Sequence, residues 1–181
     1  MKRADQRRIR LMICSAAVTM VMAAIFAFSH QPGGESEKLS KTFLDGAKTV
    51  GLDVFTPEIT FGGKEKSDGF AFKLEGRKWA HLYLFALLGV TSLLWWEQLL
   101  RLNDRWLTGR KARLRSPLAA ALAFAFCLLY ACTDELHQLL IDDRHGRLSD
   151  VLYDALGFGL SILLTLIMIK LALLIRRRIQ R

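Results

Sequence analysis

Four long apolar stretches alternate with polar segments along this chain. The apolar stretches cover approximately residues 9–28, 79–98, 117–138 and 151–175. About twenty predominantly apolar residues in a row are enough to cross the hydrocarbon core of a bilayer as a helix. The pattern therefore predicts an all-α integral membrane protein, in which residues 1–181 form one domain with four transmembrane helices.

The distribution of basic residues predicts how these spans are oriented. Net charges of +4, +4 and +5 occur at residues 1–10, 97–116 and 170–181, whereas residues 30–78 are neutral and residues 134–150 carry −3. An excess of Lys and Arg marks the cytoplasmic side of membrane helices. We therefore expect both termini in the cytoplasm, and the neutral and acidic segments on the extracytoplasmic side.

The overall composition is consistent with this assignment. The chain is 52% hydrophobic and carries a net charge of +9, but its basic excess flanks the apolar stretches instead of forming one basic face. Basic residues at the ends of spans meet anionic lipid head groups. We expect membrane lipids as partners and no nucleic acid, and leave a homo-oligomer open.

The extracytoplasmic loop between the first two spans, residues 30–78, is the only long connection. Residues 36–50 carry apolar side chains at helical spacing, which predicts a short amphipathic helix on the membrane surface. Residues 55–75 are compatible with either a hairpin or a second interfacial helix, and the sequence does not distinguish the two.

This topology brings polar side chains from several segments to one face of the membrane. Asp134 lies seventeen residues after Pro117, which places it about 25 Å along the third span, near the outer edge of the hydrocarbon. Ionisable groups at such positions are costly and mark functional sites by default. The side chains expected to form a ligand-binding pocket are Ser29, Gln31, Arg77, Lys78, His81, Asp134, Glu135, His137, Gln138, Arg144, Ser149, Asp150 and Asp154.

Several of these groups also have a purely structural interpretation. Basic side chains at the pocket mouth, Arg77 and Lys78 among them, would attract phosphate or carboxylate, but they also suit interfacial anchoring. Asp150 is equally well interpreted as the N-cap of the fourth span. Asp134 with His137 could be a pair that joins helices without binding any ligand.

Metal binding is not indicated. His81 and His137 lie on separate predicted helices, and no motif supplies two ligands at metal-binding spacing. The cysteines Cys14, Cys127 and Cys132 fall inside apolar stretches, where we interpret them as small packing residues. We therefore expect no metal and no cofactor.

Three sequence blocks resemble those of the VanZ family of small bacterial membrane proteins. In chain order, the blocks are Phe28-Ser29-His30-Gln31-Pro32-Gly33 with Ser36 and Ser40; Arg77-Lys78-Trp79-Ala80-His81; and Asp134-Glu135-Leu136-His137-Gln138 with Arg144, Ser149-Asp150-Val151 and Gly157. Two positions depart from the usual pattern, because Asp154 stands where many members have Asn and Phe85 where many have Tyr. Asp in place of Asn adds a charge to the expected pocket.

The resemblance implies a four-span protein of the bacterial cell membrane, with a link to glycopeptide resistance, teicoplanin above all. It implies no settled biochemical mechanism. The first hypothesis is a non-enzymatic cell-envelope protein whose outer pocket binds a lipid head group or a lipid-linked cell-wall precursor. Such binding would change what a glycopeptide antibiotic meets at the cell surface.

Two further hypotheses remain. A membrane-embedded enzyme would use His81 or His137, near Asp134, as a general base on a lipid or lipid-linked substrate. No nucleophile elbow or P-loop supports this alternative, so we lean away from an enzyme. A lipid transporter or scramblase ranks third, because the ionisable residues stay near one face of the predicted membrane domain.

Overall fold

The fold is that of a computed structural model, which describes residues 3–31, 38, 42, 76–102, 115–141 and 147–180. Within these residues the secondary structure is entirely helical. The four long helices are α1 (Arg3–Ser29), α3 (Gly76–Leu102), α4 (Arg115–Gln138) and α5 (Leu148–Ile179). Each is long and apolar enough to cross a membrane, which confirms the predicted all-α, four-span architecture.

The helices extend beyond the apolar stretches at most of their ends. α1 begins at Arg3 instead of residue 9, and α5 begins at Leu148 instead of residue 151. Hydropathy locates the apolar part of a helix, whereas backbone hydrogen bonding continues into its polar flanks. The surface helix predicted for residues 36–50 and the segment 55–75 lie almost wholly outside the described residues.

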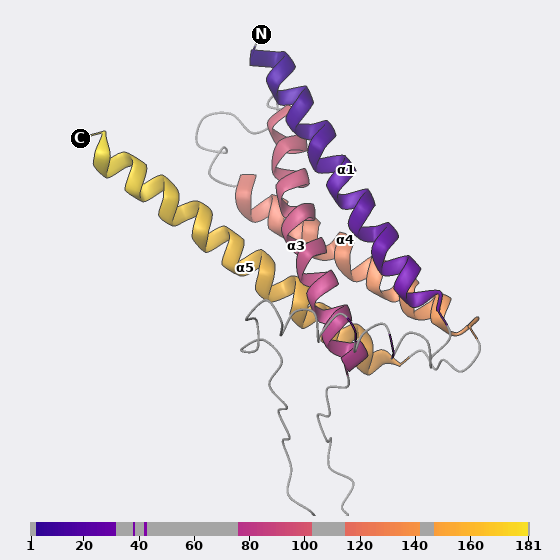
Figure 1. The fold of residues 1–181 in the computed structure, drawn as a ribbon. Coiled ribbons are helices and arrows are strands. Elements are labelled where there is room, and N and C mark those ends of the chain that lie inside the picture. The colour runs from indigo at the N-terminus through magenta and orange to yellow at the C-terminus, as the bar shows by residue number, and fades with distance from the viewer. Residues whose placement is uncertain are drawn as a thin grey trace, which may run out of the picture.

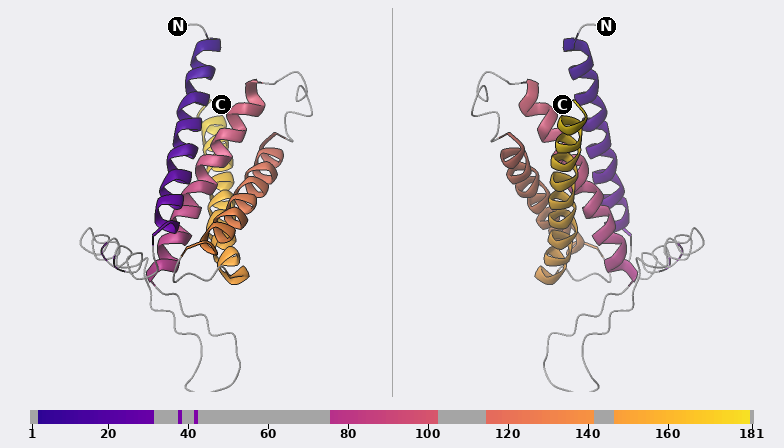
Figure 2. Two further views of the ribbon diagram at one scale, coloured as in Figure 1. Left: turned by 90° about the vertical axis from the view of Figure 1, so that its right-hand side faces the viewer. Right: turned by 90° about the vertical axis from the view of Figure 1, so that its left-hand side faces the viewer.

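Successive helices run in alternating directions, so the two ends of the chain lie at the same end of the bundle (Figures 1 and 2). α3 is central and packs against α1, α4 and α5, while α4 also packs against α5. The last turns of α1 and α4 and the first turns of α3 and α5 meet at the opposite end (Figure 1). We call this opposite end the site end of the bundle.

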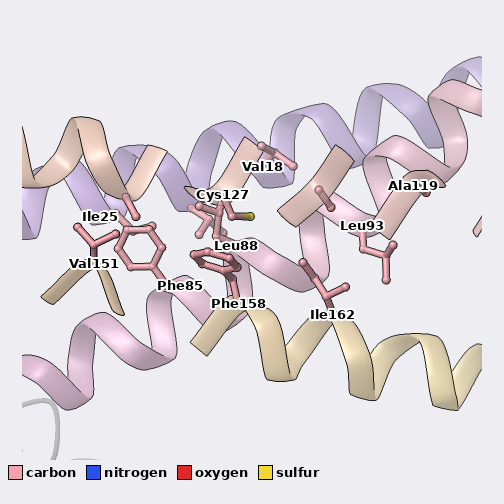
Figure 3. Close-up of a cluster of buried hydrophobic side chains, with 13 residues drawn as sticks. Val18, Ile25, Phe85, Leu88, Leu93, Ala119, Cys127, Val151, Phe158 and Ile162 are labelled. Carbon is pink, nitrogen blue, oxygen red and sulfur yellow. The ribbon is translucent and has the colours of Figure 1, made fainter. Parts of the chain in front are cut away.

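Apolar side chains from all four helices form the core, as Figure 3 shows. Ile25 of α1, Phe85 and Leu88 of α3, Cys127 of α4 and Phe158 of α5 are all fully buried. Lipid tails are as apolar as these side chains, so close packing contributes more to helix association here than the hydrophobic effect does.

α3 and α5 approach each other closely at two glycines. A Cβ at Gly89 would lie 2.8 Å from the carbonyl oxygen of Phe158, and one at Gly157 would lie 2.5 Å from that of Leu82. Both neighbours are backbone atoms, which cannot move aside as a flexible side chain could. This contact brings the first turns of α3 and α5 together and so positions the site end.

Candidate functional site

Polar side chains are concentrated at the site end, inside the bundle. They come from the end of α1, the start of α3, the end of α4 and the start of α5. Burying them is unfavourable unless each finds a partner. The buried polar residues here are Ser29, His81, Asp134, Glu135, Gln138 and Asp154.

Asp134 joins three of the helices. Its Oδ2 accepts hydrogen bonds from Ser29 Oγ of α1 at 2.8 Å and from Gln138 Nε2 of its own helix at 2.9 Å. His81 Nδ1 of α3 lies 4.0 Å from the same oxygen. The α1–α4 contact at this end is therefore polar, in contrast to the apolar core below it.

His81 lies between two carboxylates. Its Nδ1 is 4.0 Å from Oδ2 of Asp134 and 4.0 Å from Oδ1 of Asp154. Both distances exceed a direct hydrogen bond but suit a charge interaction or a bridging water. The His81 ring also stacks on Phe85, with ring centroids 6.2 Å apart, so apolar packing orients the imidazole from below.

Asp154 contributes the one carboxylate oxygen in the described residues that is both fully buried and without a hydrogen-bond partner. The residue is 1% exposed, and its Oδ2 accepts no hydrogen bond. Leaving a buried acceptor unsatisfied costs about 1–3 kcal/mol. An isolated unsatisfied oxygen of this kind requires an explanation, and a ligand or an ordered water would supply one.

Asp154 also lines a small cavity. Its volume is about 10 Å³, which is room for about one water molecule. We call it the polar cavity, and its walls are Lys78, His81, Glu135, Gln138, Asp150, Tyr153 and Asp154. All of these except Tyr153 belong to the pocket predicted from the sequence.

Lys78 lies at the rim of the polar cavity and is held there. Its Nζ is 3.6 Å from Oδ1 of Asp150 and 5.0 Å from the centre of the Tyr153 ring. Ser149 Oγ donates to the same Asp150 oxygen at 3.4 Å. A cation over an aromatic face is attracted by the ring quadrupole, so Tyr153 contributes to the position of Lys78.

Asp150 is not the N-cap of α5, contrary to the structural alternative considered from the sequence. The helix begins at Leu148 and its N-cap is Arg147, which makes no side-chain capping bond. The apolar run that suggested a start at residue 151 begins after the first turn of the helix. Asp150 lies in that first turn, where its charge is favoured by the helix dipole.

Glu135 connects α4 to the start of α5. Its Oε2 accepts a hydrogen bond from the backbone N–H of Arg147 at 2.9 Å, and its Oε1 lies 3.4 Å from Nε2 of Gln138. The first backbone N–H groups of a helix have no partner within it, so this carboxylate satisfies one of them. Glu135 is thus both a wall of the polar cavity and a link between helices.

His137 does not line the polar cavity. It stacks on Phe26 with ring centroids 4.7 Å apart, and its Nε2 lies 3.4 Å from Nδ1 of His30. The sequence predicted both His81 and His137 in one pocket. Of the histidines that the structure describes, His81 is the one that lines the cavity.

Three other residues predicted for the pocket are not among the described residues that line the polar cavity. Gln31, just after α1, is not among the residues that line the polar cavity. Arg77 is in the first turn of α3, but its side chain lies outside the described residues, as does the whole of Arg144. The described basic side chains near the expected pocket mouth are those of Lys78 and Arg147.

Among the described residues, acids outnumber bases at the polar cavity. Lys78 and His81 are the potential cations in its walls, against the carboxylates of Glu135, Asp150 and Asp154, with that of Asp134 close by. The cavity therefore favours a cationic group over an anionic one. Within the same residues, no group of three or more His, Cys, Asp or Glu side chains is arranged to hold a metal ion.

The fold and this site define a class: a four-span helical membrane protein with a buried cluster of acids and one histidine near the ends of its spans. The profile of the VanZ/LLP1 family matches residues 15–170, which include every described residue of the site. The chain therefore belongs to the VanZ/LLP1 family. No curated protein and no solved structure matched the chain in our comparisons.

Proposed function

We propose that this protein resides in the bacterial cell membrane with its site end on the extracytoplasmic side, where it binds the amine-bearing head group of a lipid or of a lipid-linked cell-wall precursor. The observation that carries the proposal is the unpartnered, buried Oδ2 of Asp154 beside the acid-lined polar cavity. The positive-inside distribution of Lys and Arg supports the orientation.

The chemistry of the cavity favours an ammonium group. An ammonium offers three hydrogen-bond donors and no acceptor, which complements carboxylate oxygens. Hydrogen bonds between ionised partners are also about twice as strong as neutral ones. The free oxygen of Asp154 supplies one acceptor, and the neighbouring carboxylates of Glu135 and Asp150 supply others.

Lys78 gives the site a means of opening. The polar cavity holds about one water molecule, so a head group enters only if a wall residue moves. Lys78 has a long, flexible stem, and its ammonium lies 3.6 Å from Oδ1 of Asp150. In the proposed binding step, the ligand ammonium replaces that of Lys78 at Asp150, and the lysine turns toward the phosphate of the ligand.

The test compares two soluble head-group analogues on the purified, full-length protein in detergent. Glycerophosphoethanolamine carries an amine and glycerophosphoglycerol does not. We expect saturation-transfer NMR to detect binding of the amine compound only, and Asp154→Asn to weaken it at least fivefold. Thr133→Ala is the matched control, because Thr133 is exposed and its Oγ1 donates to the carbonyl of Tyr130 in its own helix. Equal binding of both compounds, or an unchanged affinity in Asp154→Asn, would refute the proposal.

A second candidate function is favoured by one specific observation. His81 Nδ1 is equally distant from Asp134 and Asp154, beside a cavity of the volume of one water molecule. A histidine flanked by carboxylates can act as a general base toward such a water. The protein would then be an enzyme that hydrolyses a lipid or a lipid-linked substrate.

Lipid extracts distinguish this candidate from simple binding. Extracts of a host that expresses the wild type are compared with those from His81→Ala and His137→Ala, the latter being a histidine outside the cavity. A product that requires His81 but not His137 would support an enzyme. Identical lipid profiles from all three strains would exclude it.

A further inference from the structure

A second concavity lies beside the polar cavity, between the end of α4 and the start of α5. It has a volume of about 300 Å³, at the lower end of the range for small-molecule sites. We call it the α4–α5 groove, and its walls are Cys132, Glu135, Leu136, Leu139, Arg147, Leu148 and Val151. Most of these side chains are apolar.

The groove is continuous with the polar site through Glu135, which lines both the groove and the polar cavity. Arg147 lies on the groove wall, and its exposed side chain carries the basic charge of this region. The groove therefore combines mostly apolar walls with one basic residue, Arg147, and it meets the acid-lined polar cavity at Glu135. Exposed leucines alone would not indicate a binding site on a membrane helix. Here they line a concavity together with the charged residues Glu135 and Arg147, and that combination does indicate one.

This sequence of environments matches the order of groups in an amine-bearing phospholipid. Such a lipid has apolar chains, then a phosphate, then an ammonium. The apolar walls suit a chain, and the guanidinium of Arg147 suits a phosphate, which arginine binds through paired N–H donors. The acidic cavity on the other side of Glu135 suits the ammonium.

We propose that the α4–α5 groove holds an acyl chain of the same lipid whose head group occupies the polar cavity, so that the ligand enters sideways from the bilayer between α4 and α5. This inference rests on the proposed function, because it takes the head-group site as given. It adds a site for the acyl chain of that lipid and a route by which the lipid enters from the bilayer. It also assigns Arg147 to the phosphate.

The test measures binding of palmitoyl-oleoyl phosphatidylethanolamine and of its chain-free counterpart, glycerophosphoethanolamine, to the full-length protein in detergent. Leu136→Trp fills the groove. Leu129→Trp is the matched control, because Leu129 lies two turns earlier on the same face of α4, is 69% exposed against 64% for Leu136, and is not part of the groove. We expect Leu136→Trp to weaken the phospholipid at least fivefold and to leave glycerophosphoethanolamine unchanged. Leu129→Trp should change neither.

Arg147→Gln tests the phosphate assignment, and we expect it to weaken both ligands about equally. If Leu136→Trp leaves phospholipid affinity unchanged while Asp154→Asn weakens both ligands, the groove inference fails and the head-group site stands. If Leu136→Trp weakens the phospholipid while Asp154→Asn affects neither ligand, the head-group proposal fails and the groove remains a chain site. A wild-type dimer that Leu136→Trp dissociates would assign the groove to a second copy and overturn the inference.

Discussion

Oδ2 of Asp154 is buried and receives no hydrogen bond from the described residues. Three other acids, Asp134, Glu135 and Asp150, lie near this residue. His81 Nδ1 lies 4.0 Å from its other oxygen, and the carboxylates of Glu135 and Asp150 share the same small cavity. Like charges at close range and an unsatisfied buried acceptor both oppose folding. In the proposed function, this loss of stability is offset by the use of Asp154 as a ligand-binding group.

Replacing this carboxylate by its amide should therefore stabilise the protein. Asp154→Asn keeps the shape, removes an acid from a cluster of acids and supplies a hydrogen-bond donor, so the free energy of unfolding should rise by about 1–2 kcal/mol. Thermal unfolding of the detergent-solubilised protein measures the effect. Asp5→Asn, at an exposed position in the first turn of α1, should change the melting temperature little. A clear decrease for Asp154→Asn would show that this carboxyl group is satisfied in the folded protein.

Most of the polar cavity could be predicted at the scale of single residues. Counting charged groups near the ends of the spans selected Lys78, His81 and Asp154, among others, and these three residues line the polar cavity. It could not exclude His137, because positions three and four residues apart share a helix face only approximately. His137 lies about 100° from Gln138 around α4, and that rotation turns it toward Phe26 of α1. Tyr153 was missed because nothing in its own sequence context indicates a cation above its ring.

At the scale of elements, the position of the site depends on how closely α3 and α5 approach. The two helices meet through backbone atoms at Gly89 and Gly157. The site residues of α5 lie within two turns of Gly157, and those of α3 lie within two turns of Leu82, which Gly157 contacts. Small residues permit this approach in membrane helices generally. The start of α5 therefore reaches the polar cavity only while this contact is intact.

A single methyl group at the contact should be enough to disturb it. In Gly157→Ala the new Cβ would lie 2.5 Å from the carbonyl oxygen of Leu82, which forces the helices apart and should cost about 1–3 kcal/mol of stability. In Gly159→Ala the nearest atom is Cε2 of Phe124, at 3.6 Å, an ordinary contact. Thermal unfolding of both variants should show a loss only for Gly157→Ala. Equal behaviour of the two would contradict the packing described here.

The elements themselves were largely predictable, whereas their boundaries and mutual rotation were not. Hydropathy gave the number, type and order of the helices because about twenty apolar residues have few alternatives to a span. It placed the start of α5 at residue 151 because Leu148 is followed by two polar residues, although the helix includes them. How α4 turns its faces toward α1 and α5 depends on packing between segments distant in the sequence.

At the scale of the whole molecule, the proposed site would act on what an antibiotic meets at the cell surface. Family membership supports expressing the chain in a teicoplanin-sensitive host. We expect the wild type to raise the inhibitory concentration at least fourfold, and His81→Ala to abolish the rise. Thr133→Ala should behave as the wild type. If the wild type has no effect at equal expression, the resistance part of the proposal is wrong, whatever the site binds.

The orientation of the bundle is the central claim, because an outer-surface ligand can reach the site only if the site end faces outward. Leu140 lies just after α4 at the site end, and Gln180 just after α5 at the other end; both are exposed. Single cysteines at these positions, with Cys14, Cys127 and Cys132 replaced by Ala, report the two sides. On intact cells, a membrane-impermeant maleimide should label Leu140→Cys, and should label Gln180→Cys only after permeabilisation. Labelling of Gln180→Cys but not of Leu140→Cys on intact cells would contradict the account.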